Sequence, residues 1–225
     1  IEDKMNIEHD IEEAGVQMIL LVEDSVRFYS SILPNLYSYI LVQSKRFSTE
    51  ALNRHSATMR MRGRPKVVLA RNYEEALALY EKYKDNTLGV ISDAQFPVNG
   101  KKDPEAGLKL LRAIRAEDEY VPLIMESSDS ENRQRAEAEG FRFVDKNSKK
   151  MSIDLRRIME EHMGFGDFIF RDPNTHEELV RIHSLKELQD NIFKIPRDSM
   201  LYHISRNHMS RWLTARAIFP VSAFL

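Results

Sequence analysis

The sequence predicts an α/β protein in which a doubly wound, five-stranded parallel sheet is followed by a mostly helical C-terminal extension. Five short apolar runs alternate with longer segments whose apolar residues recur every three or four positions, the pattern of strands joined by helices. The runs are continuous rather than alternating, as expected when helices cover both faces of the sheet. A Gly-Phe-Gly sequence at 164–166 marks a boundary, beyond which the pattern becomes helical.

The length of 225 residues is enough for one large domain with an appendage. We divide the chain into residues 1–15, an acidic lead segment, residues 16–163, the sheet domain, and residues 164–225, the helical extension. Residues 217–225 form an apolar run, whereas natural chain ends are more often polar, so we expect further protein beyond Leu225.

Each predicted strand is a short apolar run bounded by polar or turn-forming residues. Among the helix signals, Asn72 is a good N-cap and Pro104 suits a first helical turn, while Pro34 should kink the long first helix or mark a break in it. The strands are expected at residues 18–22, 66–70, 88–92, 122–125 and 141–144. The helices are expected at residues 25–52, 73–83, from 104 onward, from 128 or 130 to 140, and at 153–163.

In the extension, Ser184 and Glu187 form a capping box that opens a helix running to Lys194. A second helix is expected over residues 196–217. Upstream, residues 45–71 are basic and have little periodicity in their middle. We expect a solvated loop there, with phosphate or nucleic-acid binding as the alternative.

The composition excludes several classes of function. A net charge of −2 favours neither a nucleic-acid-binding nor a membrane-surface protein. The absence of cysteine removes disulfides, thiolate metal sites and cysteine nucleophiles, and it fits a reducing compartment. No apolar stretch is long enough to span a membrane, and no signal peptide is visible. We therefore expect a cytoplasmic protein without a membrane partner.

Three carboxylates follow two of the predicted strands. Glu23 and Asp24 come directly after the first strand, and Asp93 ends the third. The carboxyl ends of parallel strands share one edge of the sheet, which is where open α/β sheets bind their ligands. Carboxylate oxygens are the ligands of hard cations, so the sequence predicts a cation site at this edge.

Two further strand ends bring a hydroxyl and an ammonium group to the same edge. Ser127 ends the fourth strand, and Lys146 follows the fifth. Together with the acids, they make a five-residue constellation that resembles the receiver domain of bacterial response regulators over residues 16–163. The segment Val90–Pro97, with the sequence VISDAQFP, carries the resemblance most clearly, and the Gly-Leu-Lys-Leu-Leu run from Gly107 follows as in that family.

The resemblance implies a flavodoxin-like fold and a phosphoacceptor chemistry. Asp93 would accept a phosphoryl group from a phosphohistidine, carried by a histidine kinase or a phosphotransfer protein. Glu23 and Asp24, with Asp93 and the backbone carbonyl of Gln95, would hold Mg²⁺. The chain would then be a switchable binding module of two-component signalling rather than an enzyme.

The same resemblance assigns roles to three more residues. Lys146 would pair with the phosphoryl oxygens, and Ser127 would hydrogen-bond to the phosphoryl group and move when Asp93 is phosphorylated. Phe143 stands where the family has its switch aromatic residue. Two departures mark an atypical member: Asn147 replaces a proline that usually forms a cis peptide, and the loop from Asp93 to Gly107 is longer than usual.

Two alternatives use the C-terminal segment. Residues 164–225 weakly resemble an inter-domain region of bacterial phosphoenolpyruvate synthase-like proteins, which would make the chain a non-catalytic docking segment joined to further domains. A DNA-binding transcriptional regulator is the other alternative, although no clear helix-turn-helix is visible. Its basic residues would be Arg197, Arg206, Arg211 and Arg216. The long first helix also makes a homodimer an option.

Overall fold

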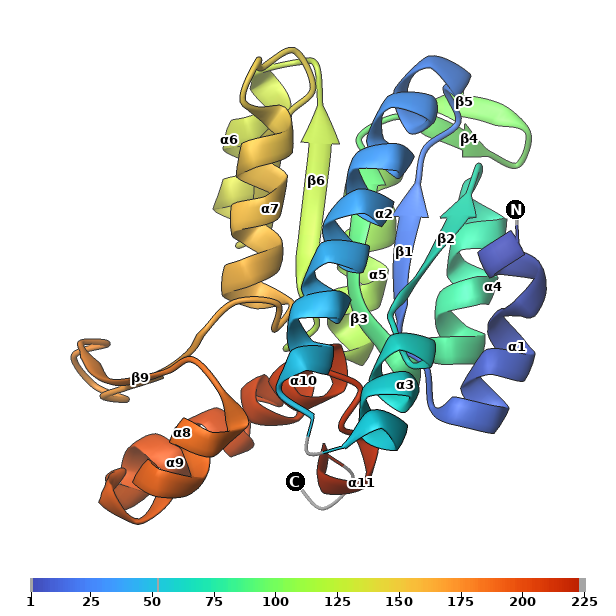
Figure 1. Ribbon diagram of the computed structural model, residues 1–225. Helices are drawn as coiled ribbons and strands as arrows, with labels where there is room; N and C mark the ends of the chain where they lie inside the picture. Colours follow the sequence, from blue (N-terminus) through green and yellow to red (C-terminus); the bar gives the residue numbers. More distant parts are fainter. Residues whose placement is uncertain (1, 52, 223–225) are drawn as a thin grey trace. The chain divides into compact units, whose positions relative to one another are not determined.

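The structure is a computed structural model that describes residues 2–51 and 53–222 (Figure 1). Contacts between its residues group them into two compact units. The first comprises Ile1–Leu41 and Pro65–Ile158, and the second comprises Val42–Arg64 and Met159–Leu225. The boundaries expected from the sequence divide the chain differently and stay a prediction. Leu52 and the end of the apolar run, residues 223–225, lie outside the described residues.

The first unit contains the predicted five-stranded parallel sheet, and its strand order is β2-β1-β3-β6-β7. This is the flavodoxin-like order, in which the chain reverses its direction of winding between β1 and β3. The predicted fold class is therefore confirmed. The strands are β1 (Met18–Val22), β2 (Lys66–Ala70), β3 (Thr87–Asp93), β6 (Leu123–Ser127) and β7 (Arg142–Asp145).

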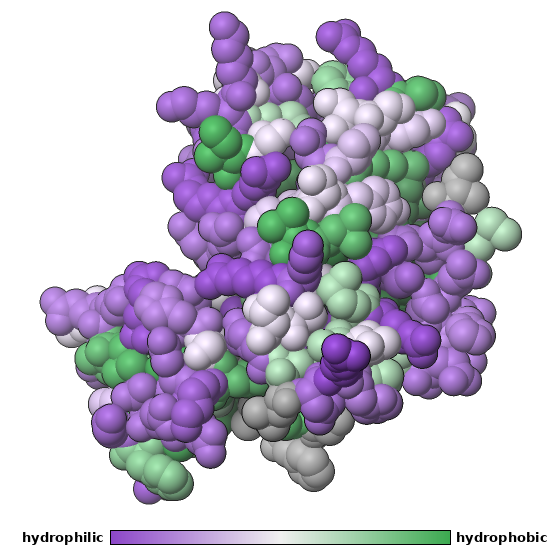
Figure 2. All heavy atoms as spheres, in the orientation of Figure 1, coloured by the Kyte–Doolittle hydropathy of each residue, from purple (hydrophilic) through white to green (hydrophobic). Residues whose placement is uncertain are grey.

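Helices cover both faces of this sheet. Figure 1 shows α2 and α7 on one face, while α4, α5 and α6 lie on the other. Buried side chains of the second group form one core with alternate residues of the strands. The visible surface in Figure 2 is mostly hydrophilic, with hydrophobic side chains in small separate areas. The helices are α2 (Val26–Thr49), α4 (Tyr73–Tyr83), α5 (Ala106–Glu117), α6 (Glu131–Ala138) and α7 (Met151–His162), and a 3-10 turn, η1, spans Lys84–Asn86.

The acidic lead segment forms a helix, α1 (Glu2–Ala14), that covers the edge strand β2. The Asp3 carboxylate accepts a hydrogen bond from the Val67 N–H at 3.1 Å, and the ammonium of Lys66 lies 2.9 Å from Asp10. An edge strand exposes backbone groups to other chains, so this helix protects a vulnerable edge. Ile7 fixes it there, because its side chain is only 2% exposed and joins the main core.

Replacing Ile7 by alanine is expected to lower the free energy of unfolding by about 2–5 kcal/mol, the usual cost of emptying a buried isoleucine site. Urea unfolding followed by circular dichroism measures it. Met5→Ala on the same helix is the control, because Met5 is 78% exposed. Equal effects of the two substitutions would contradict the packing of α1 on the sheet.

The long segment after Asp93 forms a β-hairpin rather than the predicted loop. Its strands are β4 (Phe96–Val98) and β5 (Lys101–Asp103), and Asn99 and Gly100 between them both have positive φ, 50° and 75°. Asn-Gly is the preferred pair for a two-residue hairpin turn, so the signal was present in the sequence. The next helix also starts later than predicted, at Ala106. The Asp103 carboxylate accepts a hydrogen bond from the Glu105 N–H at 2.8 Å and so holds the turn that precedes the helix.

Three other predictions needed correction. The middle of the basic stretch is a helix, α3 (Arg54–Arg62), capped by the Asn53 side chain, and not a loop. α2 continues through Pro34 rather than breaking there. The single helix expected over residues 196–217 is two helices, because Asn207 adopts a left-handed conformation with φ of 57°.

The second unit is mostly helical but also contains a strand pair that the sequence prediction missed, β8 (Phe168–Arg171) and β9 (Glu178–Ile182). The helix cap at Ser184 is confirmed, since its hydroxyl accepts a hydrogen bond from the Glu187 N–H at 3.3 Å. The Glu187 carboxylate accepts from the His183 N–H at 2.8 Å, one residue before the cap. The core of the unit includes Phe168, Phe170 and Trp212. The remaining elements are α8 (Leu185–Asn191), η2 (Ile192–Lys194), α9 (Arg197–Ile204), α10 (His208–Ala215) and α11 (Phe219–Ser222).

Candidate functional site

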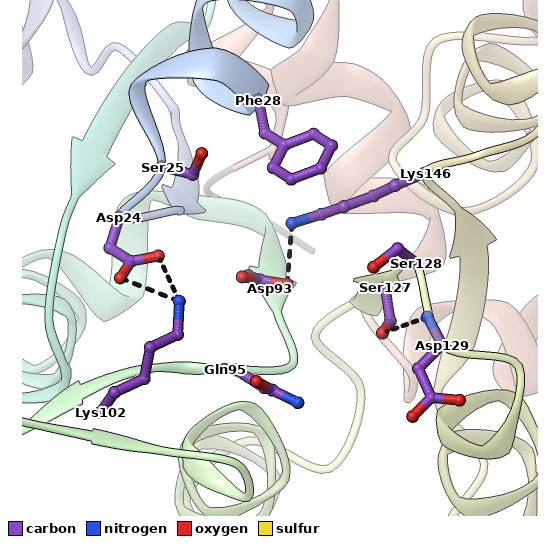
Figure 3. A pocket seen from close by; sticks show the side chains of 10 residues that line it. All are labelled: Asp24, Ser25, Phe28, Asp93, Gln95, Lys102, Ser127, Ser128, Asp129 and Lys146. Carbon is purple, nitrogen blue, oxygen red and sulfur yellow. Dashed lines mark hydrogen bonds and ion pairs between the residues drawn. The ribbon is translucent and has the colours of Figure 1, made fainter.

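A pocket of about 210 Å³ opens at the carboxyl edge of the sheet (Figure 3). Five of the predicted site residues line it, namely Asp24, Asp93, Gln95, Ser127 and Lys146. The other lining residues are Ser25, Phe28, Lys102, Ser128 and Asp129. The structure therefore brings together side chains from four strand ends, as expected for the neighbouring β1, β3, β6 and β7.

Asp93 is held at the end of β3 by two donors to the same carboxylate oxygen. Its Oδ1 accepts from the Ala94 N–H at 2.7 Å and lies 2.8 Å from the Lys146 ammonium. α5 approaches this turn closely through Gly107, whose N–H donates to the Ala94 carbonyl at 3.0 Å. A Cβ at position 107 would collide with the Asp93 carbonyl, so the glycine permits this approach.

Lys146 is the central cation of the site. Its side chain is 2% exposed and pairs with Glu23 and Asp93, while the Phe28 ring lies 4.4 Å from the ammonium. Burial disfavours the charge on Lys146, but the carboxylates of Glu126, Asp93 and Glu23 outweigh it and raise its pKa. The ammonium therefore stays charged throughout the physiological range.

Glu23 is not among the residues that line the pocket. Its side chain is fully buried, with Oε1 accepting from the Ser25 N–H at 2.9 Å and Oε2 paired with Lys146. Burial, and then the charge of Asp93, raises the pKa of Glu23 in spite of Lys146. Glu23 thus pairs with the ammonium from a fully buried position, while Asp24 and Asp93 line the pocket.

The predicted site omitted Glu126, a fourth carboxyl group on β6. It pairs with Asp93 in the strand register, is fully buried, and lies 4.0 Å from the Lys146 ammonium. Neither of its oxygens accepts a hydrogen bond from the described residues. Burial raises the pKa of Glu126 to about 8, because the nearby carboxylates offset the attraction of Lys146. In the sequence, Glu126 directly follows the apolar residues Leu123 to Met125 and precedes Ser127, so the sequence alone did not single it out.

The three acids predicted as metal ligands are close enough to share one ion. Glu23, Asp24 and Asp93 each offer a carboxylate oxygen, and these atoms lie within 4.8 Å of one another. Such an all-oxygen donor set suits a hard divalent cation such as Mg²⁺. Gln95 lines the same pocket, and ligation by its backbone carbonyl stays a prediction.

Ser127 is fixed by the start of α6. Its Oγ accepts hydrogen bonds from the Asp129 N–H at 3.1 Å and from the Asn132 amide at 3.0 Å. Because both of these bonds use the oxygen as acceptor, the hydroxyl keeps its proton to donate. Ser130, one of the two predicted caps, makes no capping hydrogen bond through its side chain.

Phe143 lies outside the pocket lining. It is half-buried on β7, packs against the main core, and has the Arg133 guanidinium 4.6 Å from its ring. Its role as a switch stays a prediction. Asn147 donates from its side chain to the Ser128 carbonyl at 3.0 Å and so links the ends of β6 and β7. No described peptide bond is cis.

The arginines proposed for DNA binding do not form an exposed basic face. Arg211 and Arg216 are buried, at 9% and 2% exposure. The Arg216 guanidinium lies 3.8 Å from the Trp212 ring and donates to the carbonyls of Gly164 and Gly166. Arg216 therefore has a structural role. Arg211 and Arg216, two of the four arginines that the DNA-binding alternative uses, are too buried to contact the phosphate backbone of DNA.

No protein-family model and no curated protein matches this chain. Among solved structures, a receiver domain protein of Clostridium thermocellum is 19% identical, with a TM-score of 0.44 over 65% of this chain and 94% of that one. Chemotaxis protein CheY4 of Vibrio cholerae is 18% identical, with a TM-score of 0.44 over 65% of this chain and 98% of that one.

A third similar structure is the receiver domain of a Pseudomonas aeruginosa sensor histidine kinase, solved with a magnesium ion in its active-site cleft. It is 20% identical, with a TM-score of 0.43 over 65% of this chain and 97% of that one. These identities and TM-scores are too low to support an argument, so the flavodoxin-like fold is assigned from the strand order alone. The resemblance of residues 164–225 to phosphoenolpyruvate synthase-like proteins stays a prediction.

None of the helices in residues 2–51 and 53–222 is long and apolar enough to cross a membrane.

Proposed function

We propose that this chain is a phosphoacceptor receiver of two-component signalling, in which Asp93 accepts a phosphoryl group from a phosphohistidine. The observation that carries this proposal is the 2.8 Å pairing of Asp93 with the buried Lys146 ammonium, inside a pocket that Asp24 also lines. A strand-end carboxylate that merely capped a loop would not need a buried cation and a second carboxylate beside it.

In the proposed reaction, one oxygen of Asp93 attacks phosphorus, so that a P–O bond forms while the P–N bond to the donor imidazole breaks. The imidazole leaves with the electron pair and takes a proton from solvent. Oδ1 is engaged by Lys146 and the Ala94 N–H, so we expect Oδ2 to be the attacking oxygen. The donor is a histidine kinase or a phosphotransfer protein.

The residues around Asp93 supply charge and hydrogen bonds. Lys146 holds the acceptor carboxylate and offers positive charge to the phosphoryl oxygens, and Ser127 donates its hydroxyl proton to one of them. Glu23, Asp24 and Asp93, with the Gln95 carbonyl, would hold Mg²⁺. When bound, Mg²⁺ supplies positive charge that offsets the charge on the transferring phosphoryl group.

The product is a changed binding surface rather than a released molecule, so we propose a binding module and not an enzyme. Movement of Ser127 toward the phosphoryl group would pull on the start of α6, because its Oγ is bonded there to Asp129 and Asn132. Phe143 and Arg133 lie on β7 and α6, next to that point. The output partner would read this surface in the bacterial cytoplasm, where histidine kinases place their phosphoryl groups.

Incubation with acetyl phosphate or phosphoramidate and MgCl₂, followed by intact-mass spectrometry, tests the proposal. We expect one phosphoryl group on the whole chain, and none when EDTA removes the metal. An unlabelled chain, under conditions that label an ordinary receiver, would contradict the proposed function.

A further inference from the structure

Lys102 stands at the open side of the pocket and pairs with Asp24. Its Nζ lies 3.3 Å from Oδ2 and 3.5 Å from Oδ1 of that carboxylate. Figure 3 shows the lysine chain reaching from the hairpin toward both oxygens. The ammonium thus occupies the side of Asp24 that faces the pocket, where a metal ion would also bind.

The hairpin that carries Lys102 is anchored to the sheet unit. Phe96 on β4 is fully buried in the main core, and the Asn99 N–H at the turn donates to Glu74 on α4 at 2.8 Å. At the end of β5, Asp103 pairs with Lys109 at 2.6 Å. Because these contacts fix both ends and the turn, the hairpin delivers the lysine to one place beside the pocket.

Asp24 and Asp93, the two predicted metal ligands whose carboxylates line the pocket, therefore each have an ammonium partner, and the two partners differ in accessibility. The Lys146 side chain is 2% exposed and is surrounded by carboxyl groups, so it stays in place. The Lys102 side chain is 57% exposed and can exchange its carboxylate partner for water. Only Lys102 can readily leave when a cation arrives.

We propose that Lys102 is a tethered competitor of the divalent cation at Asp24 and so sets the metal affinity of the site. This inference rests on the proposed function, because the cation site is the one that the receiver chemistry requires. Bound metal and the Lys102 ammonium cannot both occupy the pocket-facing side of Asp24. Metal binding must therefore include the cost of breaking the lysine contact.

The expected size of the effect follows from the exposure of the pair. Exposed ion pairs contribute little to stability, so removing the competitor should tighten Mg²⁺ binding by about two- to fivefold. Salt screens exposed charges, so the difference between the variant and the wild type should shrink as ionic strength rises.

Isothermal titration of MgCl₂ into the whole chain tests the inference. Lys102→Gln removes the competing charge, and we expect it to bind Mg²⁺ about two- to fivefold more tightly than the wild type. Lys101→Gln is the matched control, because Lys101 lies on the same strand, is exposed and does not line the pocket. Lys102→Arg keeps the charge and should bind as the wild type does.

The outcomes separate this inference from the proposed function. Equal affinities for Lys102→Gln, Lys101→Gln and the wild type would overturn the competitor role while leaving the metal site intact. Tighter binding by Lys102→Arg as well would also overturn it, because the charge would then be irrelevant. Failure of the wild type and of every variant to bind Mg²⁺ would refute the metal site itself, and with it both proposals.

Discussion

Replacing Lys146 by methionine is expected to lower the free energy of unfolding at neutral pH by about 3–5 kcal/mol, the usual cost of removing one partner from a buried ion pair. Methionine keeps much of the side-chain bulk beside Phe28 but removes the ammonium. The Glu23, Asp93 and Glu126 carboxyl groups would then face one another without a cation. Chemical unfolding of the variant and the wild type, both in EDTA, measures the difference.

Lys149→Met is the control for this prediction. Lys149 is exposed and follows the same strand, so its replacement should change stability by no more than about 0.5 kcal/mol. The loss in Lys146→Met should also diminish on acidification, because protonation of the crowded carboxylates removes their repulsion. A loss as small as that of the control, at every pH, would show that Lys146 does not hold the site together.

The second large effect concerns the pH dependence of stability, which Glu126 should govern. Its pKa is about 8 in the folded protein, against an ordinary value of 4.5. Between these two values the folded state holds a proton that the unfolded state has released. The contribution of Glu126 to stability is therefore greatest below the ordinary pKa and falls as the pH rises toward 8, by at most about 1.4 kcal/mol per pH unit for one proton.

Glu126→Gln should flatten this decline, because glutamine cannot release a proton. A smaller decline should remain, since the pKa of Glu23 is raised as well. Urea unfolding in EDTA between pH 5 and pH 8 provides the comparison, and Glu131→Gln on the exposed face of α6 is the control. Identical slopes for wild type and Glu126→Gln would mean that this carboxyl is not held protonated in the folded state.

The sheet and most of the site were predictable from the sequence. Continuous apolar runs mark the strands, and residues that follow the carboxyl ends of parallel strands lie at the same edge of the sheet. Lys146 and Asp93 are far apart in sequence, yet parallel strands bring them to 2.8 Å. The apolar strand pattern, together with the rule that the carboxyl ends of parallel strands share one edge of the sheet, was sufficient to place both residues at that edge. The same reasoning applied to Glu23, Asp24 and Ser127.

Other features depend on tertiary contacts that the sequence pattern does not encode. In the sequence, Glu126 looks like the polar end of a strand, and only the fold shows that it is buried beside Lys146. Lys102 reaches Asp24 only because the chain between Asp93 and Gly107 folds as an anchored hairpin. The Asn99-Gly100 turn was a readable signal for that hairpin, whereas the direction of the lysine side chain was not.

The most direct test of the central claim identifies the phosphorylated residue itself. The chain is treated with acetyl phosphate and MgCl₂, reduced with borohydride, digested and mapped by mass spectrometry, with Asp93→Asn treated in parallel. Reduction converts an aspartyl phosphate into homoserine. We predict homoserine at position 93 in the wild type and at no position in Asp93→Asn. Homoserine at Asp24, or an unmodified Asp93 in a labelled chain, would contradict the assignment of Asp93 as the phosphoacceptor.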